Sequence, residues 1–254
     1  MIFLVGTGLS RGDLTQKAMD VCTNAEELFL DGYTSRIDKD TLAEIERRTG
    51  KEIVQLSRSE MEEKAGQLAE KAKEKNIAIL IGGDPLMATT HKIIFIAAKK
   101  RGVRVAVIHS VSIFTIAIGE SGLDFYKFGK TFTIPKWSGH YKPVSFYETL
   151  AKNQSIGAHS LVLLDYEAEK ESSMPIGEAL AELEAAEKQY KGGIITENKE
   201  IFVMSNLGQL NETKEYIRFG DAKSRNYESG PALLIIPSQL SDIEKEMIET
   251  MYVD

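Results

Sequence analysis

The stretch that most constrains the fold is residues 77–91, which read IAILIGGDPLMATTH. The apolar run at residues 77–81 is typical of a strand buried on both faces, as in a parallel sheet. It runs directly into Gly82-Gly83-Asp84-Pro85, where the glycines permit positive φ and close approach of another molecule, and the proline can open a helix. Apolar spacing predicts that helix over residues 86–101. This order predicts a ligand-binding edge at the carboxyl end of an open α/β sheet.

Strand and helix patterns alternate along the first half of the chain. Strands are expected at residues 2–5, 27–30, 53–56, 77–81 and 103–108, with helical spacing between them. Such alternation predicts a parallel sheet with helices on both faces. We therefore expect an N-terminal α/β domain of residues 1–118.

The second half has fewer helices for each strand. Strands are expected at residues 128–135, 161–165, 200–205, 213–218 and 232–237, and helices at residues 144–152, 175–190 and after Ser241. This rhythm predicts a mixed sheet, because short connections join antiparallel neighbours. We expect a second α/β domain over residues 119–254.

Charge and cysteine content limit the possible partners and compartments. The net charge of −7 disfavours nucleic acid as the main partner, because an acidic chain repels phosphate. Cys22 is the only cysteine, so a reducing compartment fits best. No apolar stretch reaches the roughly 18 residues of a membrane span, and residues 1–5 read as a strand rather than a signal peptide. These features predict a soluble cytoplasmic protein.

Three loops are candidate binding sites, and each has a plain structural alternative. Gly6-Thr7-Gly8-Leu9 resembles part of a dinucleotide-binding turn, with Asp31 as the ribose ligand, but the third glycine of that motif falls at Arg11. The loop at residues 82–85 is either a binding loop or a tight turn in which Asp84 caps a helix. Residues 110–114 either cap a helix or form a pocket wall beside the other two loops.

Other chemical signatures are weak. The four histidines (His91, His109, His140 and His159) show no metal-ligand spacing with each other or with Cys22, and His91 reads as a core residue on an apolar helix face. The chain has neither a Gly-x-Ser-x-Gly motif nor a P-loop. The basic, aromatic residues 136–142 suit docking of an acidic or phosphorylated macromolecule with Trp137 as an anchor, or equally a domain or dimer contact.

Taken together, several motifs resemble the diphthine synthases, a family in the tetrapyrrole-methylase-like class of S-adenosylmethionine-dependent methyltransferases. The motifs are Gly6-Thr-Gly8-Leu9, Gly82-Gly-Asp84-Pro85-Leu86-Met-Ala-Thr-Thr90-His91, Ser112-Ile113, Glu120-Ser-Gly122-Leu-Asp-Phe-Tyr126-Lys127-Phe128-Gly129-Lys130-Thr131 and Leu163-Leu164-Asp165-Tyr-Glu-Ala168-Glu169-Lys170. The Gly-Asp-Pro triplet is common to the class, whereas Ala-Thr-Thr-His and Tyr-Lys-Phe-Gly-Lys-Thr are specific to the family. The resemblance covers essentially the whole chain.

The resemblance implies N-methylation, by S-adenosylmethionine, of a modified histidine of translation elongation factor 2. The acceptor would be the amino group of a 3-amino-3-carboxypropyl chain on that histidine, and the product would be diphthine, an intermediate toward diphthamide. The resemblance also implies a homodimer with the cofactor between two α/β domains. The family's cofactor contacts fall here on Leu9, Asp84, Met87, Ser112, Ile113, Leu164, Leu207 and Ala232.

This sequence departs from the family pattern at three places. Gly82 stands where the family usually has proline, Ser110-Val111 replaces the more usual alanine-proline, and Ala232 stands where many members have histidine. A backbone contact at Ala232 therefore survives better than a side-chain contact.

The chemistry needs little beyond positioning. The methyl donor is already activated, and an α-amine with a pKa of about 8 is partly neutral at cellular pH. No dedicated base is required, although Asp165 is a candidate proton acceptor. Three alternatives stay open: a corrin or tetrapyrrole methylase of the same fold, an NAD-dependent oxidoreductase using residues 6–9 and Asp31, and a non-catalytic binding module.

Overall fold

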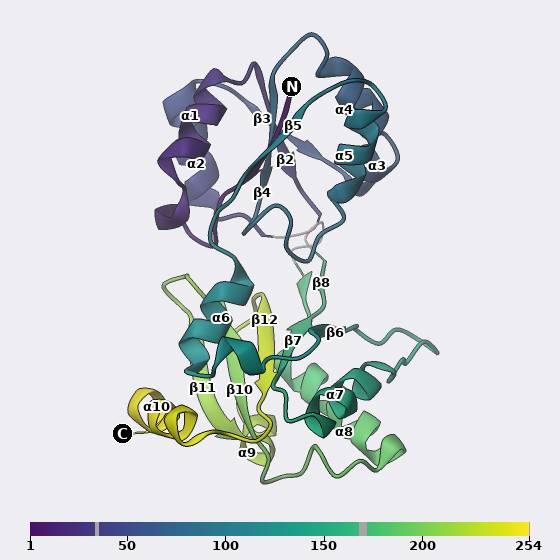
Figure 1. The fold of residues 1–254 in the computed structure, drawn as a ribbon, viewed down its shortest axis with the longest axis vertical. Helices are drawn as coiled ribbons and strands as arrows, with labels where there is room; N and C mark the ends of the chain where they lie inside the picture. Colours follow the sequence, from purple (N-terminus) through teal and green to yellow (C-terminus); the bar gives the residue numbers. More distant parts are fainter. Residues whose placement is uncertain (34–35, 168–171, 254) are drawn as a thin grey trace. The chain divides into compact units, whose positions relative to one another are not determined.

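The structure is a computed structural model that describes residues 1–33, 36–167 and 172–253. The chain divides into two compact units, Met1–Ile113 with Glu167–Glu171 (unit 1) and Phe114–Tyr166 with Ser172–Asp254 (unit 2). The domain border that the sequence suggested, after residue 118, falls inside helix α6 (Ile113–Ser121). Figure 1 shows the elements of both units.

Unit 1 is built on a parallel five-stranded sheet, as predicted. The strands are β1 (Ile2–Gly6), β2 (Glu27–Asp31), β3 (Ile53–Leu56), β4 (Ile77–Ile81) and β5 (Val105–Ile108), in the order β3-β2-β4-β1-β5. Every residue of β4 is buried, because this strand has a neighbour on each side and helices over both faces. The continuous apolar run of its sequence is the consequence of that position.

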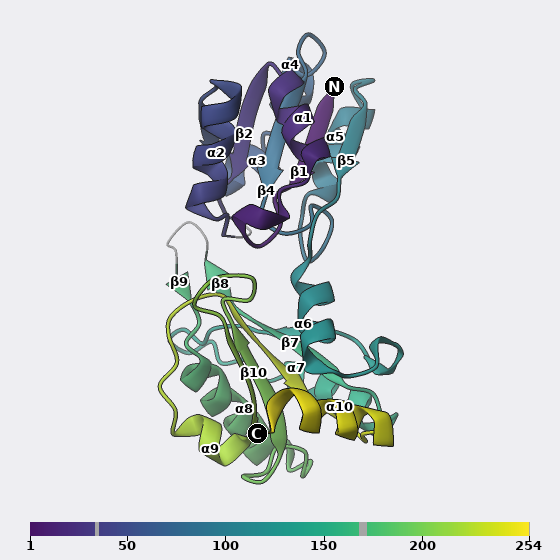
Figure 2. The same cartoon turned by 90° about the vertical axis from the view of Figure 1, so that its left-hand side faces the viewer.

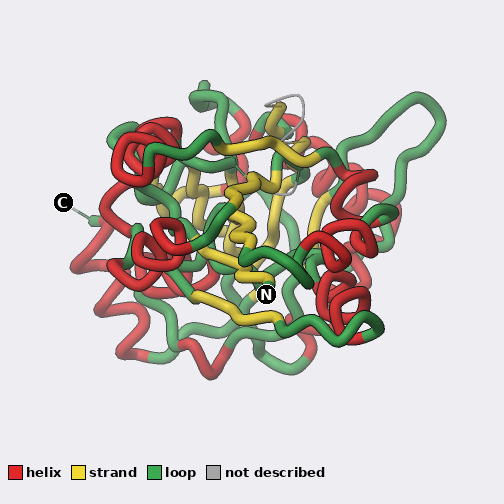
Figure 3. Tube along the Cα trace, turned by 90° about the horizontal axis from the view of Figure 1, so that it is seen from above, coloured by secondary structure: helices red, strands yellow, loops and turns green. Residues whose placement is uncertain are grey.

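The helices of unit 1 cover both faces of the sheet. Helices α1 (Gln16–Asn24) and α2 (Lys39–Thr49) pack on one face, and α3 (Arg58–Glu62), α4 (Ala65–Lys71) and α5 (Lys92–Lys99) pack on the other (Figures 1 and 3). The predicted helix at residues 86–101 was too long, because α5 begins only at Lys92. Residues 84–91 form turns, in which Ala88 has a φ of 50°.

Unit 2 contains a mixed five-stranded sheet, again as predicted. Its strands are β6 (Phe132–Ile134), β7 (Ser160–Leu164), β10 (Glu200–Ser205), β11 (Thr213–Arg218) and β12 (Ala232–Ile236), in the order β11-β10-β12-β7-β6. Only the pairing of β6 with β7 is parallel. A short two-stranded ribbon, β8 (Tyr166–Glu167) with β9 (Ser172–Ser173), follows β7.

Helices cover both faces of this second sheet as well. Helices α7 (Phe146–Ser155), α8 (Ile176–Tyr190) and α9 (Phe219–Lys223) bury their apolar residues on one face. Helix α10 (Asp242–Tyr252) lies on the other face (Figure 2). Its Tyr252 packs its ring against Phe202 of β10 and donates its hydroxyl hydrogen bond to the Glu120 carbonyl of α6. Two short 3-10 helices, η1 (Arg11–Asp13) and η2 (Phe125–Lys127), complete the elements.

Candidate functional site

Three loops meet at the carboxyl edge of the unit 1 sheet. They follow β1, β4 and β5, and β1 lies between the other two strands. Gly8 and Gly83 form an isolated antiparallel bridge, in which Gly8 N–H donates to Gly83 O at 3.3 Å and Gly83 N–H donates to Gly8 O at 2.9 Å. The sheet topology therefore brings two of the predicted loops into backbone contact.

Gly6 is the residue that allows all three loops to approach. A Cβ atom at this position would lie 2.7 Å from Gly83 O, 2.9 Å from the Pro85 ring and 3.0 Å from Ser110 Cβ. Real side chains do not tolerate such contacts with backbone, so any larger residue would push the loops apart. Gly83, with a φ of 70°, supplies the left-handed conformation of the second loop.

The Asp84 carboxylate fastens the second loop to the third. Its Oδ1 accepts the Leu86 N–H at 3.0 Å, which forms a local turn, and its Oδ2 lies 2.7 Å from His109 Nδ1. Ser110 in turn donates its hydroxyl hydrogen bond to Asp13 O, behind the first loop, at 3.0 Å. The predicted turn is present, but the predicted helix cap is wrong, because α5 begins only at Lys92. The binding-loop interpretation stays a prediction.

The predicted cofactor residues of unit 1 all lie on this edge. Leu9 is held by its N–H, which donates to Asp13 Oδ2 at 2.9 Å, and its side chain contacts the position of Gly83. Ser112 is buried, Met87 is 46% exposed on the second loop, and Ile113 begins α6. With Asp84, these residues form a candidate site whose ligand no observation of unit 1 identifies.

A buried side-chain pair, His91 with Asp31 (the clasp), holds the second loop in place. His91 Nε2 lies 2.9 Å from Asp31 Oδ2 and both side chains are fully buried, while His91 Nδ1 lies 3.1 Å from Pro85 O. His91 thus ties the end of the loop to its beginning and to the end of β2. Asp31 is engaged in this clasp and is 1% exposed, which argues against its predicted use as a ribose ligand in an oxidoreductase.

The pairing of His91 with Asp31 predicts that a single and a double substitution change the free energy of unfolding by different amounts. His91→Leu leaves the Asp31 carboxylate buried beside an apolar group and should lower the free energy of unfolding by about 3 kcal/mol. His91→Leu with Asp31→Asn removes that charge, so the double variant should be more stable than His91→Leu alone. Urea denaturation measures both, with His140→Leu on the exposed loop as the control. A double variant no more stable than His91→Leu alone would contradict the pairing of His91 with Asp31.

The predicted residues of unit 2 gather at one end of its sheet. Leu164 ends β7, Ala232 begins β12, and Ser205, which ends β10, pairs directly with Ala232. Leu207 follows within the same turn, and both Leu164 and Leu207 are buried. Ala168, Glu169 and Lys170, which contribute to the family resemblance, lie outside the described residues.

Sequence reasoning missed a pair of unsatisfied polar side chains at this end. Asn206 is 3% exposed with a φ of 50°, and within the described part of the chain neither its Oδ1 nor its Nδ2 has a hydrogen-bond partner; Ser205 Oγ has none either. Buried amides without partners cost free energy, so such groups are expected where a ligand or water completes them. The signal was present as a Ser-Asn pair directly after a strand of apolar residues.

Sequence reasoning also missed Glu182, a carboxyl group close to Asp165. Asp165 Oδ2 accepts the Lys136 N–H at 3.2 Å, and Glu182 Oε1 accepts the next N–H, that of Trp137, at 3.0 Å. Glu182 is 1% exposed and its Oε2 has no partner among the residues described. Burial, with the nearby charges of Glu178 and Asp165, raises the pKa of Glu182 to about 7. Its place on the buried side of α8, between two buried alanines, was the sequence signal.

Glu182 predicts a particular pH dependence of stability. Because its pKa is raised on folding, from 4.5 to about 7, its stabilising contribution is full below pH 4.5 and is lost as the pH rises through 7. Glu182→Gln keeps the acceptor for Trp137 without the charge. The variant should gain about 1–3 kcal/mol of stability relative to wild type between pH 5 and pH 8. Chemical denaturation at the two pH values measures this, and a gain equal to that of the exposed control Glu246→Gln would contradict it.

The loop that Asp165 and Glu182 hold extends away from the sheet of unit 2, between β6 and α7 (Figures 1 and 3). Ser138 and Tyr141 close its tip through two backbone hydrogen bonds of 3.1 and 2.9 Å. Lys142 Nζ lies 5.3 Å from the centre of the Trp137 ring, and Tyr141 is 66% exposed. The predicted basic, aromatic loop is therefore an ordered surface feature.

Neither a metal site nor a membrane-spanning helix is found among the described residues. They contain no group of three or more His, Cys, Asp or Glu side chains that are placed to hold a metal ion. In the same part of the chain, no helix combines the length and apolar character that crossing a membrane requires.

Comparisons with known proteins place this fold and these loops in a class. The family model of the Tetrapyrrole (Corrin/Porphyrin) Methylases matches residues 1–221. The fold and the loop edge of unit 1 therefore belong to a tetrapyrrole methylase, and the protein is a methyltransferase.

Full-length relatives define the family within that class. A diphthine synthase of Methanococcus maripaludis is 33% identical over 99% of both chains, and one of Methanocaldococcus jannaschii is 35% identical over 98% of both. A solved structure titled as diphthine synthase has a TM-score of 0.87 and 29% identity, with 99% of this chain and 96% of that chain covered. One from Entamoeba histolytica, with a provisional name of the same kind, has a TM-score of 0.88 and 31% identity, covering 100% of this chain and 99% of that chain. The chain belongs to the diphthine synthase family.

Proposed function

We propose that this protein transfers methyl groups from S-adenosylmethionine to the amino group of a 3-amino-3-carboxypropyl-histidine on translation elongation factor 2, giving diphthine. The observation that carries the proposal is the convergence of the loops after β1, β4 and β5 in a chain that is 33% identical to a diphthine synthase over 99% of both chains. An NAD-dependent oxidoreductase is disfavoured, because Asp31 is buried in its clasp with His91.

The residues present fit the proposed cofactor. The loop edge of unit 1 offers the Asp84 carboxylate and an exposed Met87 side chain. Considered by itself, unit 2 has an unsatisfied amide, that of Asn206, at one end of its sheet. Polar and apolar groups of this kind suit a ligand with a nucleoside, a sulfonium and an amino-acid end. We propose that Leu9, Asp84, Met87, Ser112, Ile113, Leu164, Leu207 and Ala232 hold it.

Ala232 takes part in this proposal through its backbone. The side chain that many family members have at this position is histidine, and a methyl group replaces it here. Because Ala232 pairs with Ser205 in the sheet, its backbone is fixed beside the unsatisfied Ser205 hydroxyl and the Asn206 amide. These neighbouring polar groups are candidates for hydrogen bonds to a ligand at this position.

The chain's own residues position the reactants and accept a proton. When bound, the cofactor supplies a methyl group that is already activated on a sulfonium. An acceptor amine with a pKa of about 8 needs only a modest base at neutral pH. Asp165 and Glu182 lie at the same end of the unit 2 sheet, and the pKa of Glu182, about 7, suits it to take a proton there. Either carboxylate would act after the amine is oriented, which is the larger requirement.

Two surfaces support protein partners. The loop at residues 136–142, with its basic and aromatic side chains, is proposed to dock the elongation factor, whereas the net charge of −7 gives no support to nucleic acid. The buried Cys22 is compatible with a reducing cytoplasm.

A second copy of the chain is the proposed partner of α10. Ile243, Met247 and Met251 recur every four residues and are 75%, 41% and 41% exposed, so they form an apolar stripe on one helix face. Phe125, which is 66% exposed, adds to the apolar surface of this unit. Met247→Glu should convert a dimer to a monomer in sedimentation velocity; the control Glu246→Gln should not. Wild-type protein that sediments as a 28.2 kDa monomer would contradict the dimer.

Mass spectrometry of the elongation factor tests the function directly. Incubation with this protein and S-adenosylmethionine should add successive increments of about 14 Da at one histidine, and none to a factor whose histidine lacks the aminocarboxypropyl chain. Asp165→Asn and Glu182→Gln distinguish the two proton acceptors, because the one that matters should slow the additions and flatten their dependence on pH. No mass shift from a folded wild-type protein would contradict the proposal.

A further inference from the structure

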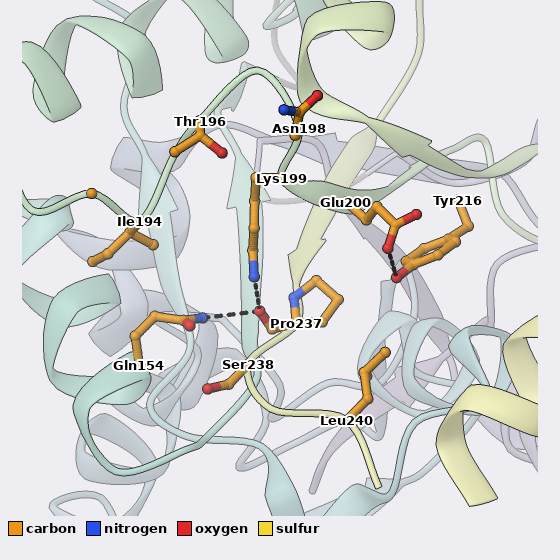
Figure 4. Close-up of a pocket in the computed structure, with 11 residues that line it drawn as sticks. Gln154, Ile194, Thr196, Asn198, Lys199, Glu200, Tyr216, Pro237, Ser238 and Leu240 are labelled. Carbon is orange, nitrogen blue, oxygen red and sulfur yellow. Dashed lines mark hydrogen bonds between the residues drawn. The ribbon is translucent and has the colours of Figure 1, made fainter. Parts of the chain in front are cut away.

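A cavity of about 470 Å³ lies in unit 2, away from the residues discussed above. It is at the end of the sheet where β10 begins and β12 ends, whereas Leu164 and Ala232 mark the opposite end. Its volume is within the range of small-molecule sites. Polar side chains line it, among them Gln154, Thr196, Asn198, Lys199 and Ser238 (Figure 4).

Lys199 carries the positive charge of this cavity. Its side chain extends along the cavity wall to Pro237 O, which Nζ contacts at 2.6 Å, and Gln154 Nε2 donates to the same oxygen at 3.1 Å (Figure 4). No carboxylate of the described residues lies within ion-pair distance of Lys199 Nζ. Burial lowers the pKa of Lys199, and the charge of Glu200 offsets this effect only in part.

Other lysines of this chain show which partners a partly buried ammonium group ordinarily contacts. Lys127, Lys214 and Lys223 each contact a glutamate, and Lys51 donates to three carbonyl oxygens at the end of α1. An ammonium has three N–H donors, and Lys199 uses one of them, on a neutral carbonyl. Lys199 is only partly exposed, so its ammonium loses part of its hydration, and an anionic ligand would compensate for that loss.

The nearest acidic group does not serve as that partner. The Glu200 carboxylate accepts a hydrogen bond from the Tyr216 hydroxyl at 2.9 Å, on the other side of the cavity from Gln154 (Figure 4). Thr196 and Asn198 instead bring neutral hydroxyl and amide groups to the rim. The cavity thus presents one cation and several neutral donors, which is the composition of a site for an oxyanion.

We propose that this cavity binds a small molecule through a carboxylate or phosphate group, with Lys199 as the counter-charge and the amide of Gln154 as a neutral donor beside it. The site is separate from methyl transfer, and it stands or falls independently of the proposed function. It adds a second ligand to a chain whose family resemblance points to one cofactor.

Isothermal titration of the full-length protein tests the site with two probes, sodium phosphate and sodium citrate, in buffers of matched ionic strength. Wild type should bind at least one probe, and the response to the two probes distinguishes phosphate from carboxylate chemistry. Lys199→Gln should weaken binding about tenfold or more, because it removes a charge-assisted contact. Lys152→Gln, which removes an exposed charge of α7, should leave binding unchanged. Equal heats from wild type and Lys199→Gln, or no heat from wild type, would overturn the proposal.

A second measurement uses wild-type protein alone, so it does not depend on the folding of a variant. Acetylation with acetic anhydride, mapped by mass spectrometry, reports how accessible each amine is. The probe that binds should protect Lys199 and leave the rate at Lys152 unchanged. Equal rates at Lys199 with and without either probe would show that nothing occupies the cavity.

Discussion

The close contact of the Gly6 and Gly83 backbones is the constraint on which the candidate site depends. Side chains hold neighbouring loops of a parallel sheet apart, and here the absence of a Cβ at Gly6 lets Gly83 O, the Pro85 ring and Ser110 occupy the space. The two hydrogen bonds of the Gly8–Gly83 bridge then fix the position of the first loop relative to the second. Backbone contacts therefore hold the loops at this edge, and the side chains of the loops are left available to contact a ligand.

Polar side-chain contacts add to the backbone contacts that the glycines allow, and they connect the loops to each other and to the sheet. Asp84 connects the second loop to His109 on the third, and the buried pair of His91 with Asp31 connects the far end of the second loop to β2. Removing either partner of the buried pair would leave a charge or a polar ring without compensation, so the pair holds one loop conformation specifically. In unit 2 the corresponding edge is built differently: the sheet register fixes Ala232 beside Ser205, while buried polar groups remain unsatisfied.

The sequence predicted both sheets because the signals of their strands are local. The apolar run of β4 and the alternation of strands with helices depend only on neighbouring residues, and both sheets have the predicted character. The helix at residues 86–101 was predicted too long for a non-local reason. Thr89 and Asp84 compete for backbone hydrogen bonds in this stretch, and His91 is drawn to Asp31, sixty positions away in the chain. The local apolar pattern of residues 86–101 contains no signal of the contact between His91 and Asp31.

The same distinction separates the site residues that were predicted from those that were missed. Leu9, Asp84 and Ser112 were singled out because glycines, an acidic residue or a serine follow a strand, and strand ends share an edge. Glu182 and Asn206 depend on burial by residues distant in sequence, which makes an ordinary helical glutamate and an ordinary turn asparagine into unusual groups. The cofactor contacts themselves rest on the family resemblance, because spacing alone leaves the ligand of such an edge open.

Binding of S-adenosylhomocysteine to a Gly6→Ala variant is the most direct measurement of the central claim. Wild type should bind the compound in isothermal titration, and the added methyl group, 2.7 Å from Gly83 O, should separate the loops and weaken binding about tenfold or more. Gly12→Ala, whose Cβ would have only an ordinary contact, 3.9 Å from Ser10 Oγ, should bind as wild type does. A folded Gly6→Ala variant with unchanged affinity would contradict the account.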